Sequence, residues 1–182
     1  MKLLRTIRLD PSDTFVFERA AEPGEWAVPG SFVFWSQDPS AFEGKARSAF
    51  RAGLLGIASL GWSTLAQIVE ADDEQHAAAI DMLAQRLVEN FGAPNPALAR
   101  LAAAEEIAYA ASLCDHPLDT LIAVHRVYED DSIRETFRTL RPRNGPKPLR
   151  AFSFLEAEEH DEVTEEVDLS KLARGEDKGA YK

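Results

Sequence analysis

The first 35 residues alternate between apolar and polar side chains in short runs that turn-forming residues separate. This two-residue period is typical of β-strands with one buried face. Prolines, glycines and aspartates mark the turns, and short turns join strands in antiparallel order. The pattern therefore predicts an antiparallel meander at the N-terminus. The expected strands lie at 3–9, 14–19 and 31–35, and the expected turns at 10–13, 22–25 and 29–30.

Two longer segments follow the helical period instead. Between 73 and 91 the apolar residues form one stripe, and Asp72 and Gln75 have the spacing of a capping box. A second helix is predicted over 96–113, with Asn95 as its N-cap and a proline at its first position. The linker between these helices is short, which favours an antiparallel helical hairpin.

The other predicted elements are shorter. A helix is expected over 132–141, because its first residues have the spacing of a capping box and its apolar residues recur every three or four positions. Together the elements favour the α+β class, an antiparallel β-sheet packed against a helical hairpin plus short helices. Further strands are expected at 62–70, 121–128 and 149–156, and a further short helix at 41–52.

The composition is that of one globular domain with a charged end. Of the 182 residues, 45% are hydrophobic and 28% are charged, which is enough for a full core. The segment 156–168 holds eight acidic residues and no lysine or arginine. We therefore expect a single domain over 1–155 and an acidic, flexible C-terminal tail over 156–182.

The overall charge bears on the class of partner. The formal net charge is −11, from 20 basic and 31 acidic residues, which disfavours binding to nucleic acids and to anionic membranes. No apolar stretch reaches the length of a membrane span, and the N-terminal segment does not continue as a signal peptide. The single cysteine, Cys114, excludes an internal disulfide. We expect a cytoplasmic protein.

The segment 134–150 is basic against this acidic background. Arg134, Arg138 and Arg141 have the spacing i, i+4, i+7, so they share one face of the predicted helix. Guanidinium groups on one face suit the recognition of carboxylates or phosphates, so these arginines are a candidate anion-binding site. The alternative, which we favour, is that they pair with the protein's own surplus acids, including those of 156–168.

A second candidate site is a pocket with tryptophan walls and a carboxylate. Trp26 and Trp35 lie at the ends of turns or strands, where an amphipathic ring can line a pocket or a dimer interface, and Trp62 belongs to the same aromatic-rich part of the chain. Glu105 lies in a helix that is apolar nearly all round, so it or Glu106 is expected to be a partly buried carboxylate. The alternatives are core packing for the tryptophans and a salt bridge to an arginine for the glutamate.

Cys114, Asp115 and His116 are the densest cluster of potential metal ligands, which His125 or Glu105 would have to complete. The alternative, which we favour, is an ordinary helix end with a histidine near its C-terminal dipole. The sequence contains no phosphate-binding glycine loop, no GxSxG nucleophile motif, no HExxH and no CxxC. No cofactor is expected.

Three segments carry a resemblance to a known family: LLRTIRLDPSDTFVFERAAEPGEWAVPGSFVFW, KARSAFRAGLLGI and EEIAYAASLC…TLIAVHRVYEDDSIRETFRTL. Over roughly residues 3–155 the chain resembles a functionally uncharacterised group of small proteobacterial proteins. The resemblance implies no activity, cofactor or catalytic residue.

Two functions from different classes fit these features. The first, which we favour, is a non-catalytic binding or accessory protein that recognises an acidic metabolite or a partner protein through the Arg134 face. Its aromatic surface would also suit the interface of a homodimer. The second is a small metal-assisted enzyme in which five side chains converge, namely Glu105, Cys114, Asp115, His116 and His125.

Overall fold

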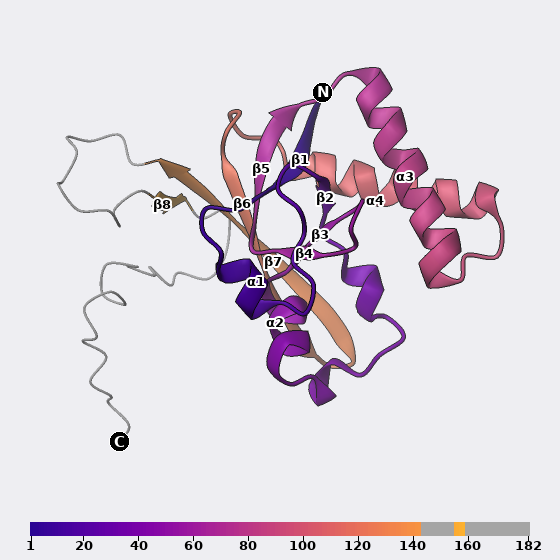
Figure 1. Ribbon diagram of the computed structural model, residues 1–182, viewed down its shortest axis with the longest axis horizontal. Helices are drawn as coiled ribbons and strands as arrows, with labels where there is room; N and C mark the ends of the chain where they lie inside the picture. Colours follow the sequence, from indigo (N-terminus) through magenta and orange to yellow (C-terminus); the bar gives the residue numbers. More distant parts are fainter. Residues whose placement is uncertain (143–154, 159–182) are drawn as a thin grey trace.

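Eight strands form a single antiparallel sheet in the computed structural model, which describes residues 1–142 and 155–158 (Figure 1). The strand order is β4-β3-β2-β1-β5-β6-β7-β8, so the N-terminal strand lies inside the sheet. The elements in chain order are β1 (Lys2–Ile7), α1 (Ser12–Val16), β2 (Trp26–Val28), the 3₁₀-helices η1 (Ser31–Phe34) and η2 (Pro39–Ala41), α2 (Gly44–Ala52), β3 (Leu54–Gly56), β4 (Trp62–Ser63), β5 (Leu65–Glu70), α3 (Asp73–Phe91), α4 (Pro96–Ser112), β6 (Leu121–Glu129), β7 (Ser132–Pro142) and β8 (Leu155–Glu158).

One face of the sheet carries the core. By register and alternation, Leu4 of β1, Ile68 of β5, and Ile122 and Val124 of β6 share this face, and each is at most 4% exposed. Helix α4 packs on β1 and β2, α2 packs on β6, and α3 packs on α4 (Figure 1). The predicted α+β class, an antiparallel sheet packed against a helical hairpin plus short helices, is confirmed. Within the described residues, no helix has the length and apolar character that a membrane span needs.

The helical hairpin forms where local capping chemistry predicts it. The Asp72 carboxylate accepts a hydrogen bond from the Gln75 amide at 2.7 Å, and the Gln75 side chain accepts one from the Asp72 amide at 3.1 Å. At the start of α4, the Asn95 side chain accepts a hydrogen bond from the Leu98 amide at 2.9 Å. These contacts satisfy amides that would otherwise lack a partner at each helix start.

Two of the predicted N-terminal strands are wrong. The segment expected as the strand 14–19 begins inside the helix α1, because the carboxylate of Asp13 turns inward and accepts hydrogen bonds from Thr64, at 2.5 Å from its hydroxyl and 3.2 Å from its amide. The segment 31–35 forms η1, after Gly30 turns the chain at φ +77°. The helices α1 and η1 both depend on contacts with residues far away in the sequence, Asp13 with Thr64 and the turn at Gly30 with α4 and β6. A local two-residue period cannot indicate such contacts.

The predicted helix 132–141 is also wrong, because this segment is the strand β7. Its nine-residue register with β6 runs from Glu129 opposite Ser132 to Leu121 opposite Leu140. A spacing of four, as between Ile133 and Phe137, places two side chains on one face of a helix and equally on one face of a strand. The pattern was therefore ambiguous, and pairing with β6 decided it.

The remaining predictions agree in part. The strand 62–70 is divided into β4 and β5, and the helix predicted over 41–52 begins only at Gly44, as α2, after η2 has ended at Ala41. Strand β8 pairs with β7, with Glu156 opposite Arg141, so the first residues of the segment expected as an acidic tail lie beside the basic strand. Residues 149–154 of the last predicted strand, and the rest of the tail from 159, lie outside the described residues.

Candidate functional site

Arg126 of β6 is an arginine with no exposed surface. Its Nε donates to Glu135, which lies directly opposite on β7, at 2.6 Å. Its Nη1 donates to the carbonyl oxygens of Phe50, at 3.1 Å, and Gly53, at 2.7 Å, and its Nη2 donates to the carbonyl oxygen of Pro29. One guanidinium thus joins the sheet to the end of α2 and to the turn before η1. A buried charge is tolerated only when it is paired and hydrogen-bonded in this way.

Helix α4 brings two further polar groups to this arginine. Glu106 accepts a hydrogen bond from the Gly30 amide at 2.9 Å. Burial raises the pKa of Glu106, the Gly30 amide lowers it, and the charges of Glu135 and Arg126 act in opposite directions. Burial, together with the charges of Glu135 and Glu106, raises the pKa of Tyr109 to about 12. We call Arg126, Glu135 and Glu106 the buried polar cluster, and Tyr109, which is 41% exposed, lies at its edge.

The buried polar cluster fixes the turn from which η1 begins. Arg126 donates to the carbonyl of Pro29 and Glu106 accepts from the amide of Gly30, so both polar groups of the peptide bond that leads into the left-handed residue Gly30 are hydrogen-bonded to the domain. The guanidinium of Arg126 also lies 5.8 Å from the centre of the Phe34 ring. The hydrogen bonds of the cluster join the sheet, the end of α2, α4 and the turn before η1 to one another, so we interpret the cluster as a scaffold.

Replacement of Glu106 by glutamine tests the electrostatic state of this scaffold. The folded protein holds the Glu106 proton more tightly than the unfolded chain does, because the pKa of Glu106 is raised above its ordinary value of 4.5. The stability that this proton gives is therefore present at low pH and is lost as the pH rises through the raised pKa. Glutamine keeps the acceptor for Gly30 without the charge. We expect Glu106→Gln to be more stable than the wild type near neutral pH, and its stability to change less than that of the wild type as the pH rises from 4.5 toward neutrality.

Urea denaturation at a series of pH values measures this effect. The matched control is Glu105→Gln, because Glu105 precedes Glu106 in α4 but is exposed. This control should keep the pH dependence of the wild type. Equal pH dependence in Glu106→Gln and the wild type would contradict the expected effect.

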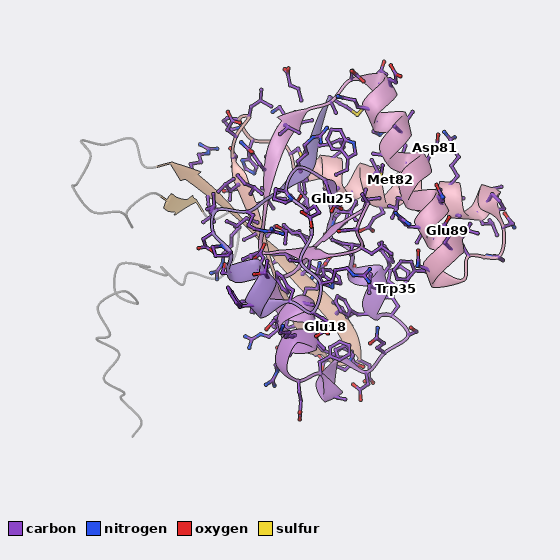
Figure 2. All side chains as sticks on the ribbon, viewed as in Figure 1. Glu18, Glu25, Trp35, Asp81, Met82 and Glu89 are labelled. Atoms are coloured by element: carbon purple, nitrogen blue, oxygen red, sulfur yellow. The ribbon has the colours of Figure 1, made fainter. Side chains whose placement is uncertain are left out.

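A surface hollow is lined in part by the segment that follows the turn at Gly30. Its volume is about 270 Å³, and its walls come from the η1–η2 segment and from the β6–β7 hairpin. The Trp35 ring is 75% exposed and Tyr128 is 36% exposed, and Figure 2 shows where Trp35 lies in the molecule. We call this feature the aromatic hollow. The described residues that line it are Phe34, Trp35, Gln37, Pro39, Tyr128, Asp131 and Ile133.

Carboxylates give the aromatic hollow a negative character. The Tyr128 hydroxyl donates to the carboxylate of Asp131 at 3.3 Å. Asp38, whose carboxylate accepts hydrogen bonds from the amide and hydroxyl of Ser40, precedes the lining residue Pro39. Desolvation raises the pKa of Tyr128, and the charges of Asp131 and Asp38 raise it further. Each of these charges opposes the formation of a tyrosinate, as expected beside carboxylates.

The structure does not bring the four residues of the predicted pocket together. Trp35 lines the aromatic hollow, whereas Trp62 stacks on Phe34 at 5.1 Å between ring centres. Trp26 is buried beneath the guanidinium of Arg5, at 3.7 Å. Glu105 is exposed on α4, and the partly buried carboxylate is its neighbour Glu106.

The three arginines of the predicted anion site do not share a face. On the strand β7, Arg134 and Arg138 point to one side of the sheet and Arg141 to the other, because side chains alternate along a strand. Arg134 lies 3.7 Å from Glu129 and 3.5 Å from Asp130, so the protein's own acids offset its charge. The prediction of three arginines on one face is therefore wrong, because Ser132–Pro142 is a strand and not a helix.

The potential metal ligands are also dispersed. Cys114 is buried, its thiol contacts the carbonyl of Ala110 at 3.4 Å, and burial raises its pKa to about 11. Asp115 is exposed, and the carbonyl of His116 accepts a hydrogen bond from Lys2. His125 is exposed on β6. In the part of the chain that the structure describes, no three histidine, cysteine, aspartate or glutamate side chains are grouped so as to hold a metal ion.

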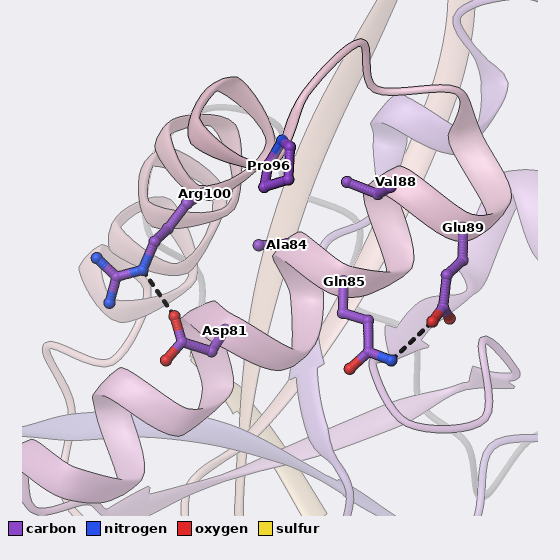
Figure 3. A pocket seen from close by; sticks show the side chains of 7 residues that line it. All are labelled: Asp81, Ala84, Gln85, Val88, Glu89, Pro96 and Arg100. Atoms are coloured by element: carbon purple, nitrogen blue, oxygen red, sulfur yellow. Dashed lines mark hydrogen bonds and ion pairs between the residues drawn. The ribbon is translucent and has the colours of Figure 1, made fainter.

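A second hollow, of about 360 Å³, lies between α3 and α4 (Figure 3). Ala84, Val88 and Pro96 give it an apolar floor. Its polar rim is paired internally: Asp81 binds Arg100 at 2.7 Å, and the Gln85 side chain donates to Glu89 at 2.7 Å (Figure 3). Because these polar groups bind one another, the second hollow offers a ligand mainly apolar contacts.

The sequence profile of a family described as "Family of unknown function (DUF6505)" matches residues 1–157. The chain belongs to this family. The matched region of this DUF6505 protein contains both the buried polar cluster and the aromatic hollow, and it ends within β8. The predicted membership of an uncharacterised family is thus confirmed. No curated protein and no solved structure matches the chain.

Sequence reasoning missed the hairpin wall of the hollow in this DUF6505 protein. The pattern of 132–141 predicts a helix, and a helix there gives no reason to place Tyr128 and Asp131 in one site. The signal that indicates a hairpin is the pair Asp130-Asp131 between two runs of alternating residues, since aspartate tolerates the left-handed conformation that a two-residue turn needs.

Proposed function

We propose that this DUF6505 protein is a non-catalytic binding protein whose ligand occupies the aromatic hollow. The observation that supports it is a tryptophan that is 75% exposed at the wall of a hollow of about 270 Å³. Exposed aromatic rings around a concave surface are characteristic of binding sites, where tryptophan and tyrosine contribute most of the affinity. The lining residues offer ring faces, an amide and a carboxylate, which are groups that hold a ligand.

The scaffold beneath the hollow supports the same proposal. Phe34 lies at the hollow and contacts three other rings, those of Phe42, Phe50 and Trp62, at 5.1–5.7 Å. Together with the fastened turn at Gly30, these contacts hold the wall before a ligand arrives. A site that is already formed loses less conformational entropy on binding, so more of the contact energy appears as affinity.

An acidic ligand held by Arg134 and Arg138 is a weaker proposal. Arg134 is shared between Glu129 and Asp130, and an incoming anion would have to displace one of these carboxylates. The aromatic hollow requires no such displacement, and its opening to solvent suits a protruding group of a partner protein.

An NMR screen of a fragment library with cationic, neutral and anionic members tests the proposal. We expect the fragments that bind to shift the signals of Trp35, Gln37 and Ile133. Trp35→Ala should lower the affinity of these fragments about tenfold, the usual effect of removing an aromatic anchor. The matched control is Phe15→Ala, which removes a ring that is 72% exposed on α1 and does not line the hollow. Binding that is unchanged in Trp35→Ala, or that gathers on another surface, would overturn the proposal.

A further inference from the structure

The aromatic hollow also carries information about the charge of its ligand. We propose that it binds a positively charged side chain, the guanidinium of an arginine or the ammonium of a lysine, on a partner polypeptide. This inference rests on the proposed binding function and deepens it, because it names the chemical class of the ligand.

The first argument is the chemistry of the walls. Trp35, Tyr128 and Phe34 line one hollow and come from two elements that are far apart in the sequence. Aromatic faces attract cations through their negative quadrupole, and tryptophan does so most strongly. Arg5 on Trp26, at 3.7 Å, shows this pairing already in use inside the protein.

The second argument is the charge that the hollow leaves unbalanced. Asp131 lines the hollow, and its carboxylate accepts a hydrogen bond from the uncharged hydroxyl of Tyr128. Arg134, which is three residues away, lies instead within ion-pair distance of Glu129 and Asp130. No lysine or arginine is among the described residues that line the hollow. A cation from outside would therefore meet a carboxylate that has no lysine or arginine beside it among the described residues of the hollow.

The third argument is the backbone at this carboxylate. The turn that joins β6 and β7 places Asp130 at φ +51° and Asp131 at φ +57°. Two consecutive residues with positive φ define a turn for which Asn-Gly is the preferred sequence, because a Cβ is unfavourable there. Aspartate at the second position costs stability relative to glycine and supplies a carboxylate to the hollow. Such a cost is typical of a functional site.

The fourth argument separates a side chain from a simple ion. Pro39 and Ile133 give the hollow apolar surface beside its rings and its carboxylate. The aliphatic stem of an arginine or lysine packs on such surface while its charged head reaches the polar end. The hollow, with a volume of about 270 Å³, has room for a stem and a head group together.

Titration of the full-length, ¹⁵N-labelled protein with amino-acid amides tests the inference. The probes are N-acetyl-arginine amide, N-acetyl-lysine amide and the uncharged N-acetyl-norleucine amide. The observed signal is the indole N–H of Trp35, which Trp35→Phe identifies among the three tryptophans. We expect both cationic amides to shift it saturably and to bind at least about fivefold more tightly than the norleucine amide, with the difference decreasing as salt is added.

Two variants of the turn form a matched pair. Asp131→Asn removes the charge that lines the hollow and keeps a residue that tolerates positive φ, so it should fold normally and bind the cationic amides about fivefold more weakly. Asp130→Asn makes the same change at the adjacent position, whose carboxylate lies beside Arg134 instead, and should bind within about twofold of the wild type.

Each contrary result has its own meaning. If the norleucine amide binds at the hollow as tightly as the cationic amides, or if Asp131→Asn leaves their affinity unchanged, the assignment of charge is wrong while the binding function stands. If tetramethylammonium binds more tightly than either amide, the ligand is a free cation and the polypeptide assignment is wrong. If no probe shifts Trp35 and the fragments also miss the hollow, the binding function fails as well.

Discussion

Replacing Arg126 by methionine is expected to lower the free energy of unfolding by about 3–5 kcal/mol, the usual cost of breaking a buried ion pair. The carboxylate of Glu135, which is 12% exposed, would lose its partner. The carbonyls of Pro29, Phe50 and Gly53 would each lose a donor in the same substitution. Since whole domains are stable by only about 5–15 kcal/mol, this one change would remove much of the total.

Urea denaturation of purified variants measures this loss. The matched control is Arg134→Met, which removes an exposed arginine and its ion pairs from the neighbouring strand and should cost at most about 1 kcal/mol. The double variant Arg126→Met/Glu135→Leu should be more stable than Arg126→Met, because it leaves no unpaired buried carboxylate. If Arg126→Met costs no more than the control, the cluster is not the scaffold that we describe.

The second large effect is expected in α4. Ala103 is 0% exposed and lies on the side of the helix that packs toward the sheet, together with Ala99, Ile107 and Ala110. Ala103→Leu would add three carbon atoms where the packing has no room for them. We expect a loss of about 3 kcal/mol, at the upper end of the usual cost of overpacking.

Thermal and urea denaturation of a neighbouring variant provide the comparison. Ala102→Leu places the same side chain on the exposed side of α4, where leucine is a good helix former, so its stability should change by less than about 0.5 kcal/mol. Equal losses in both variants would show that α4 is buried on both sides in solution, as in an assembly of two copies. That outcome would contradict the description of α4 as a helix with one buried and one exposed side.

The difference between Ala102 and Ala103 marks the limit of prediction from the sequence. Helix α4 is apolar nearly all round, so its pattern indicates a helix but does not indicate which side faces the sheet. The same helix contains Glu105 and Glu106, of which only the second reaches the buried polar cluster. Both choices depend on how the hairpin lies on β1 and β2, and this placement is a tertiary contact.

The candidate site was less predictable than the fold. Its position at the end of a predicted strand makes Trp35 a predicted pocket residue, and in the structure it lines the aromatic hollow. The other wall residues, Tyr128 and Asp131, belong to the β6–β7 hairpin, which is far from Trp35 in the sequence. Only the folding of η1 beside this hairpin brings the two walls together, so no spacing rule within the sequence relates them.

The sequence by itself determined the features that local chemistry controls. These are the α+β class, the helical hairpin with its caps at Asp72 and Asn95, and the turn at Gly30. The caps and the turn depend on hydrogen bonds and dihedral angles within a few residues, and the α+β class follows from the mixture of two-residue and helical periods along the chain. Tertiary structure decided the segments whose period fits two conformations. Ser132–Pro142 became a strand because β6 offered it a partner, and 31–34 became a 3₁₀-helix because the buried Arg126 and Glu106 hold the turn before it.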